Sequence, residues 1–234
     1  MKRFYKQVST ERQPDGSAIV LLDGRRLKTP AKADLVLPGL ALAEAVAAEW
    51  AAQGSEIRPH EMPLTRLAAT AIDRVQQSSE HAAGEIVRYG DTDLLAYRAE
   101  EPPELAARQA QEWQPLLDWF RERYDVQIAV TSGIVAIPQP ADLRPRLSRI
   151  CDALDAFRLT ALHAATSATG SVVLGLALLE GAIDAATAHR LGLLDELFQL
   201  ERWGEDEEAA ARRAALRAEL DSVQRFLALL NAEG

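Results

Sequence analysis

The sequence contains a single cysteine, Cys151, among 234 residues, which excludes an internal disulfide and favours a reducing compartment. Its neighbours have the apolar spacing of a helix, so we expect a core side chain rather than a nucleophile. No Gly-x-Ser-x-Gly elbow, phosphate-binding loop or dinucleotide glycine pattern occurs in the sequence. The four histidines lack the spacing of a metal site, so we expect no bound metal.

A net positive charge occurs only at the start of the chain, and the rest of the chain is acidic. The formal net charge is −9, although residues 1–35 carry eight basic and four acidic side chains. Nucleic-acid binding needs a broad basic surface, so an acidic main body argues against it. The uncharged run 161–179 contains His163, Thr, Ser and Gly, so we expect a buried helical core with His163 inside it, and no membrane insertion.

The first forty residues have the short, strand-forming segments of a small antiparallel sheet. Asp23-Gly24 predicts a type I′ hairpin turn, because this turn needs positive φ angles that Gly accepts freely. So small a sheet needs other parts of the chain to cover one of its faces. The expected strands are residues 3–9, 17–22, 25–29 and 34–37.

After Pro38 the apolar spacing becomes helical. Leu40, Ala43, Ala47 and Trp50 fall on one stripe, which predicts a buried Trp50. A change from strands to helices at this point indicates an α+β fold. We expect a β-rich N-terminal domain at 1–38 and a larger all-helical domain at 39–234.

The stretch 191–208 holds seven acids and one arginine, so it carries −6 of the net charge of −9. Its apolar spacing predicts one amphipathic helix that stops at Gly204. Glu201 projects close to the apolar line, so it should lie either at the rim of the buried face or beside a partner, because a lone buried charge is costly. The polar side of this helix comprises Asp195, Glu196, Gln199 and Trp203. The stretch is either a solvated charged face or an acidic docking surface anchored by Trp203.

An ordered set of short motifs runs through most of the chain and resembles one known family. The family is that of the assembly chaperones for the alpha subunit of the F-type ATP synthase catalytic head. The motifs are Phe4-Tyr5-Lys6, Leu22-Asp23-Gly24-Arg25, Leu27-Lys28-Thr29-Pro30, Glu49-Trp50 with Gln53, Met62-Pro63-Leu64-Thr65, Asp93-Leu94-Leu95-Ala96-Tyr97, Gln109 with Trp113, and Glu196 with Gln199 and Trp203-Gly204.

The resemblance implies an ATP-independent chaperone that binds the unassembled alpha subunit and shields the surface that later meets the beta subunit. It implies no catalysis, no cofactor and no small-molecule substrate. The functionally important acid of the family falls on Glu196, with Asp195 beside it, and we expect Glu196, Asp195, Gln199, Trp203 and Glu201 to bind the partner. No Arg- and Ser-rich presequence stands before Phe4, so the chain resembles a bacterial, cytoplasmic member.

Two other functions compete with this one. One is a helical adaptor for some other protein client. The other is a small-molecule enzyme with a pocket between the β-rich and helical parts, which would need a set of catalytic side chains that the sequence does not display.

Overall fold

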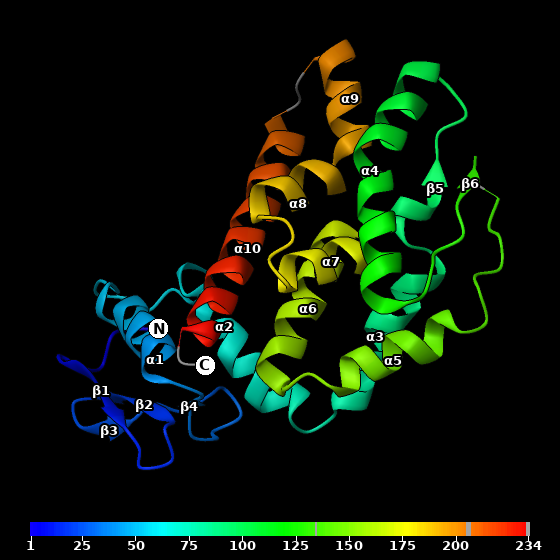
Figure 1. Ribbon diagram of the computed structural model, residues 1–234. Helices are drawn as coiled ribbons and strands as arrows, with labels where there is room; N and C mark the ends of the chain where they lie inside the picture. Colours follow the sequence, from blue (N-terminus) through cyan, green and yellow to red (C-terminus); the bar gives the residue numbers. More distant parts are fainter. Residues whose placement is uncertain (134, 205–206, 233–234) are drawn as a thin grey trace. The chain divides into compact units, whose positions relative to one another are not determined.

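The small antiparallel sheet predicted for the start of the chain is present, with β2 at its centre (Figure 1). β2 pairs with β1 along one edge and with β3 and β4 along the other. Its sequence, Ala-Ile-Val-Leu-Leu, is buried at every position but one, which makes it the core strand. The strands are β1 (Val8–Arg12), β2 (Ala18–Leu22), β3 (Arg25–Arg26) and β4 (Val36–Leu37). The computed structural model describes residues 1–133, 135–204 and 207–232.

The predicted hairpin turn joins β2 to β3. Asp23 and Gly24 have φ angles of 48° and 77°, as a type I′ turn requires. The first strand begins at Val8 and not at residue 3, because the preceding segment is held by other contacts. The Asp23 carboxylate accepts hydrogen bonds from the Lys6 and Gln7 backbone N–H groups at 3.0 and 2.8 Å.

Helix α1 (Leu40–Ala51) packs on β1 and β2 and covers one face of the sheet. Trp50 is buried in this layer, as predicted, with 8% of its surface exposed. The Glu49 carboxylate accepts bonds from the Leu64 and Thr65 backbone N–H groups, both at 2.8 Å, and so caps the next helix. That region comprises η1 (Pro59–Glu61), α2 (Pro63–Thr70) and the π-helical turn η2 (Ala71–Val75).

The chain forms two compact units. The first comprises 1–79, 156–161 and 225–234, and the second comprises 80–155 and 162–224. The strands that precede Pro38 and the helices α1 and α2 therefore belong to the same unit. The change from strands to helices near residue 38 is real, and the fold is α+β as predicted, while a domain boundary at that residue stays a prediction.

The second unit is helical around the apolar helix α7. α7 packs between α4 and α8, and α4 also contacts α9 (Figure 1). The small residues around Gly170 allow close approach, as a Cβ atom at Gly175 would stand 2.4 Å from the Thr166 hydroxyl oxygen. The helices that lie in this unit wholly or in part are α3 (Ser79–Asp91), η3 (Leu94–Ala96), α4 (Pro103–Tyr124), α5 (Leu143–Asp152), α6 (Ala156–Thr169), α7 (Val172–Leu179), α8 (Ala185–Gly192), α9 (Leu194–Trp203) and α10 (Glu207–Asn231).

Asp93 stabilises this core through buried hydrogen bonds. It is fully buried and accepts hydrogen bonds from the Ser171 hydroxyl at 2.7 Å and the Val172 N–H at 2.7 Å, at the start of α7. Its carboxylate also accepts from the Leu95 N–H at 2.9 Å, which caps η3. Burial raises the pKa of Asp93 to about 6, although these hydrogen bonds oppose the rise.

His163 corrects one expectation about this core. It lies in α6 with 35% of its side chain exposed, and its Nε2 is 2.9 Å from a Glu85 carboxylate oxygen. It is therefore a partnered residue at the edge of the core and not inside it. Cys151 is buried as predicted, and burial raises the pKa of its thiol to about 12, which keeps it protonated and inert.

Candidate functional site

Helix α9 carries the residues that the sequence singled out for partner binding. The predicted single helix through this stretch is in fact two, because α8 ends at Gly192 and α9 begins at Leu194. Leu194 and Phe198 are the buried residues of α9. The predicted stop at Gly204 is confirmed, since this residue has a φ of 88° and its N–H bonds the Leu200 carbonyl.

Asp195 is partly buried and bound within the second unit. Its carboxylate accepts a hydrogen bond from Gln109 Nε2 at 2.7 Å, and Gln109 itself is only 1% exposed. The Gln109 Oε1 accepts in turn from the Ala99 backbone N–H at 2.7 Å, and its carbonyl accepts from Arg98 at 2.7 Å. Burial lowers the pKa of Arg98, and the charge of Asp195 opposes that change. Asp195 is thus one end of a polar network under α9.

Glu196 is paired even more closely. It binds Arg213 Nη1 at 2.8 Å and also the guanidinium of Arg212, both from α10. The side chains of Glu196 and Arg213 are 26% and 9% exposed, so this ion pair is largely withdrawn from water. Burial opposes ionisation of Glu196, but the hydrogen bonds from Arg213 and Arg212 outweigh it and hold its pKa below the ordinary value.

Glu201 lies at the rim of the apolar face of α9 and has a partner, as the cost of a lone buried charge led us to expect. The sequence places it near the apolar line of α9, yet 57% of its side chain is exposed. One guanidinium nitrogen of Arg108 lies 2.8 and 2.9 Å from its two carboxylate oxygens. The carboxylate reaches water because Glu201 lies in the last turn of α9, beyond Leu194 and Phe198, the buried residues of this helix.

Trp203 and Gln199 are the predicted residues that face solvent. Trp203 is 78% exposed in the last turn of α9, and Gln199 is also exposed. Among the described residues, only a few large apolar side chains share this degree of exposure. Beside Trp203, the Arg202 guanidinium stacks 4.4 Å from the Phe198 ring centroid. We call Gln199, Trp203 and the three paired acids the α9 surface. Of the acidic run after Gly204, Glu205 and Asp206 lie outside the described residues.

Sequence reasoning missed the partners of these acids. Gln109 and Trp113 were visible as motif residues, and the structure explains them: Gln109 holds Asp195, and Trp113 donates its indole N–H to the Leu191 carbonyl at 3.1 Å. Arg108 and Arg213 left no signal, because an arginine in α4 or α10 looks like any solvated helix residue until the helices pack.

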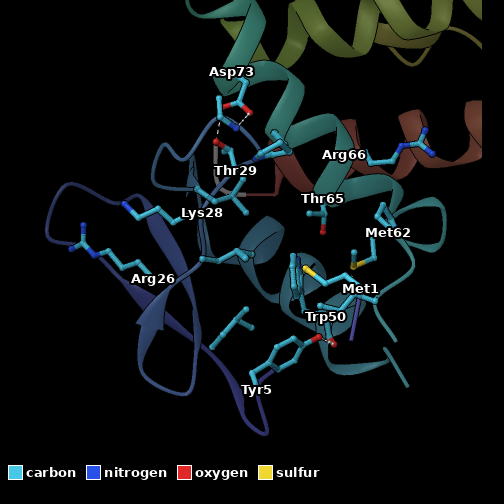
Figure 2. A pocket seen from close by; sticks show the side chains of 18 of the residues that line it. Met1, Tyr5, Arg26, Lys28, Thr29, Trp50, Met62, Thr65, Arg66 and Asp73 are labelled. Atoms are coloured by element: carbon cyan, nitrogen blue, oxygen red, sulfur yellow. Dashed lines mark hydrogen bonds between the residues drawn. The ribbon is translucent and has the colours of Figure 1, made fainter. Parts of the chain in front are cut away.

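The first unit contains a second candidate site, which we call the N-terminal cleft (Figure 2). It has a volume of about 1210 Å³ and lies between the sheet segment 1–35 and the segment 50–74. Figure 2 shows Tyr5, Trp50, Met62 and Met1 along one side, with Arg26 and Lys28 opposite them.

Metal binding and membrane crossing find no support in residues 1–133, 135–204 and 207–232. Within these ranges no group of three His, Cys, Asp or Glu side chains is placed to hold a metal ion. No helix in the same ranges has the length and apolar content that a membrane crossing needs.

Comparison with known proteins settles the family. A family model described as ATP12 chaperone protein matches residues 2–121, which is about half of the chain. The chain belongs to the ATP12 chaperone family. The resemblance drawn from the ordered motifs is thereby confirmed.

Bacterial ATP12 structures share the whole fold. The chain is 43% identical to Atp12 from Paracoccus denitrificans, with a TM-score of 0.93 over 98% of both chains, and it matches an Asp-to-Lys mutant of that protein equally well. It is 38% identical to the Atu1473 protein of Agrobacterium tumefaciens, a putative chaperone, with a TM-score of 0.92 over 98% of this chain and 86% of that one. The mitochondrial atp12 protein of Schizosaccharomyces pombe is 30% identical over 89% of this chain and 75% of its own length.

Proposed function

We propose that this ATP12-family protein is an ATP-independent assembly chaperone that binds the unassembled alpha subunit of F-type ATP synthase. It shields the surface of that subunit that later meets the beta subunit. Membership in the ATP12 chaperone family, with a shared fold over nearly the whole chain, is the observation that carries this proposal. The physical need is plain, since an unpartnered subunit exposes apolar interface and aggregates, and a binder lowers its free concentration.

The α9 surface is the proposed contact. Trp203 offers a large exposed ring at the end of a helix that is clamped by ion pairs to α4 and α10. An exposed Trp on a helix that is held in place is well suited to anchor a partner, because the backbone that carries it loses little conformational freedom on binding. Because Asp195, Glu196 and Glu201 already have partners within the chain, we propose that they position Trp203 and Gln199 and add negative potential, with direct pairing to the client as a lesser role.

The polar groups of the N-terminal cleft also favour a binding function over a catalytic one. The Tyr5 hydroxyl donates to the Trp50 carbonyl at 2.7 Å, and the Thr65 hydroxyl donates to Glu49 at 2.7 Å. The Thr29 hydroxyl donates to Asp73 at 2.5 Å. These groups are engaged in structural bonds, so among the described lining residues no nucleophile stands beside a free base. We propose no catalysis, no cofactor, and action in the bacterial cytoplasm.

The decisive experiment measures capture of purified, unassembled alpha subunit and suppression of its aggregation without nucleotide. Wild type should bind and protect it, and addition of beta subunit should release it. Trp203→Ala should weaken capture by about 30-fold, the effect of losing a hot spot of about 2 kcal/mol, with unchanged melting. The matched control is Val135→Ala, another exposed apolar residue, which should bind like wild type. Full capture by Trp203→Ala excludes the α9 anchor, and no capture by wild type excludes the alpha subunit as client.

A further inference from the structure

The N-terminal cleft combines an apolar wall with a basic rim. Tyr5, Trp50 and Met62 are buried residues of the wall, while Met1 and Phe4 stand at the mouth with 73% and 64% of their surfaces exposed. Exposed apolar side chains beside an apolar hollow are typical of a binding site. The cleft uses residues other than those of the α9 surface, and nothing in the proposed function accounts for it.

The rim is positively charged and the charge is not cancelled locally. Arg25, Arg26, Lys28, Arg66 and Arg74 line the cleft, together with only two acids, Asp23 and Asp73. Arg26 and Lys28 share a single carboxylate, that of Asp34, at 3.4 and 2.6 Å. Neither Arg25 nor Arg74 has an ion-pair partner in the part of the chain that the structure describes.

The two acids of the lining are committed to the fold. The Asp23 carboxylate holds the backbone before β1, and the Asp73 carboxylate accepts from the Thr29 hydroxyl and from the Ala31 N–H at 3.0 Å (Figure 2). The cleft therefore presents a net positive potential within a chain whose net charge is −9. A ligand with carboxylates close to its apolar part matches this arrangement.

Trp50 supplies the second, independent observation. Its indole Nε1 is buried and has no hydrogen-bond acceptor among the described residues, although the residue is only 8% exposed and lines the cleft. Its ring is fixed beside Tyr5, with ring centroids 5.6 Å apart. Because buried N–H groups are nearly always paired, this donor needs an acceptor that the described chain does not supply, and a ligand in the cleft supplies one once the side chains that cover Nε1 move aside.

We propose that the N-terminal cleft binds an extended peptide segment of an unassembled protein that carries a bulky apolar side chain between acidic residues. The apolar side chain occupies the cleft beside Trp50 and Met62, a peptide carbonyl accepts the Trp50 N–H, and the acids face the arginines of the rim. A peptide fits better than a hydrocarbon tail, because a tail offers no acceptor to a donor in the apolar wall. Such a site gives an ATP12-family chaperone a second contact with its client, besides the α9 surface.

Anisotropy of a fluorescein-labelled peptide with a central Leu-Phe pair between Glu residues tests this proposal on the full chain. Wild type should bind it, and added salt should weaken binding. The variant Arg25→Glu/Arg74→Glu should bind at least tenfold more weakly. Trp50→Phe keeps an aromatic ring but removes the N–H, and should lose about twofold to tenfold, the effect of one hydrogen bond.

The matched control is Arg225→Glu, which makes the same kind of charge change in the first unit at an exposed α10 residue outside the cleft. It should bind the peptide as wild type does. A second peptide with Lys in place of each Glu should not bind, and a third with Ser in place of Leu-Phe should bind at least tenfold more weakly. Melting curves of each variant establish that the unit is folded before its binding is compared.

Three results overturn the proposal. One is no binding of the acidic peptide by wild type up to about 1 mM. Another is equal binding of the Glu and Lys peptides, or equal losses in the rim variant and in Arg225→Glu. The third is binding of dodecanoate, with the same dependence on Arg25 and Arg74, in place of the peptide. Because the assay uses no alpha subunit, it can fail while alpha-subunit capture through Trp203 succeeds, and the reverse also holds.

Discussion

Reversing the charge of Glu196 should weaken the packing of α9 on α10 and destabilise the protein, contrary to what the sequence pattern suggests. Glu196 appears as a solvated acid on a polar helix face, for which a mutation changes stability by no more than about 0.5 kcal/mol. The structure instead pairs it with Arg213, whose side chain is only 9% exposed. A lysine at this position removes the Glu196 carboxylate from Arg213 and sets a third positive charge beside Arg212 and Arg213.

The magnitude follows from the burial of the pair. Breaking a fully buried ion pair by removing one partner costs about 3–5 kcal/mol, and an exposed pair contributes about 0–1 kcal/mol. The Glu196–Arg213 pair is nearer the buried limit, with Glu196 26% exposed, so we expect a loss of about 2–4 kcal/mol. For a chain of this size that is a drop of roughly 5–15 °C in melting temperature.

Two reversals elsewhere on the same unit serve as controls. Glu201→Lys breaks a pair whose carboxylate is 57% exposed and should cost no more than about 1 kcal/mol. Glu208→Lys makes the same charge change at an exposed residue in the first turn of α10, with no ion-pair partner in the described chain, and should cost no more than about 1 kcal/mol through the helix dipole. Hydrogen exchange of the α9 amides should accelerate in Glu196→Lys alone.

The reasoning is refuted if Glu196→Lys melts like Glu208→Lys, or if Glu201→Lys proves the most destabilising of the three. A pH series adds an independent check. Because the pKa of Glu196 is lowered in the folded state, its contribution to stability is present above the ordinary carboxyl pKa and is lost as the pH falls through the folded value. The stability difference between wild type and Glu196→Gln should therefore shrink in acid.

Three further outcomes are expected. Gly24→Val should cost about 1–2 kcal/mol in urea denaturation, because Gly24 has a φ of 77°, whereas Gly24→Asn should be milder. Trp50→Ala should cost about 3–5 kcal/mol, and an unchanged melting temperature would contradict its structural role. Since burial raises the pKa of Asp93 from 3.8 to about 6, its stabilising effect is full below pH 3.8 and falls as the pH rises through 6. Asp93→Asn should thus cost about 2 kcal/mol more at pH 4 than at pH 7, and the opposite trend would show that its hydrogen bonds outweigh burial.

Local chemistry made the hairpin and the helical region predictable. A turn with positive φ angles has few sequence solutions, so Asp23-Gly24 placed β2 and β3 correctly. Errors arose where tertiary contacts replaced local ones. Residues 126–130 include the strand formers Val126, Ile128 and Val130, yet the strand of this region is formed by the neighbouring residues Thr131–Ser132, which are β6 and pair with β5 (Tyr97–Arg98). A proline inside a helix usually kinks or ends it, yet α4 runs through Pro115 without interruption.

The site was less predictable because it depends on packing between helices. Helical spacing identified Trp203 and Gln199 as solvent-facing, and both are exposed. The same spacing could not show that Glu196 meets arginines 16 and 17 residues further on, since that contact depends on how α9 and α10 turn back on each other. Nor could it show the N-terminal cleft, whose lining comes from segments up to 73 positions apart.

Pairing within the chain changes what the acidic pattern of α9 signifies. An acid that binds a client directly should stand free in the unbound protein, whereas Asp195, Glu196 and Glu201 each hold another helix or network in place. Their removal therefore acts first on the orientation of α9, and through it on Trp203. Loss of client capture in a Glu196 variant does not by itself show that α9 contacts the client. Trp203→Ala leaves these ion pairs intact, so the same loss in that variant would show the contact. Comparing the two variants in one experiment therefore separates the effect of Glu196 on client capture from the effect of Trp203.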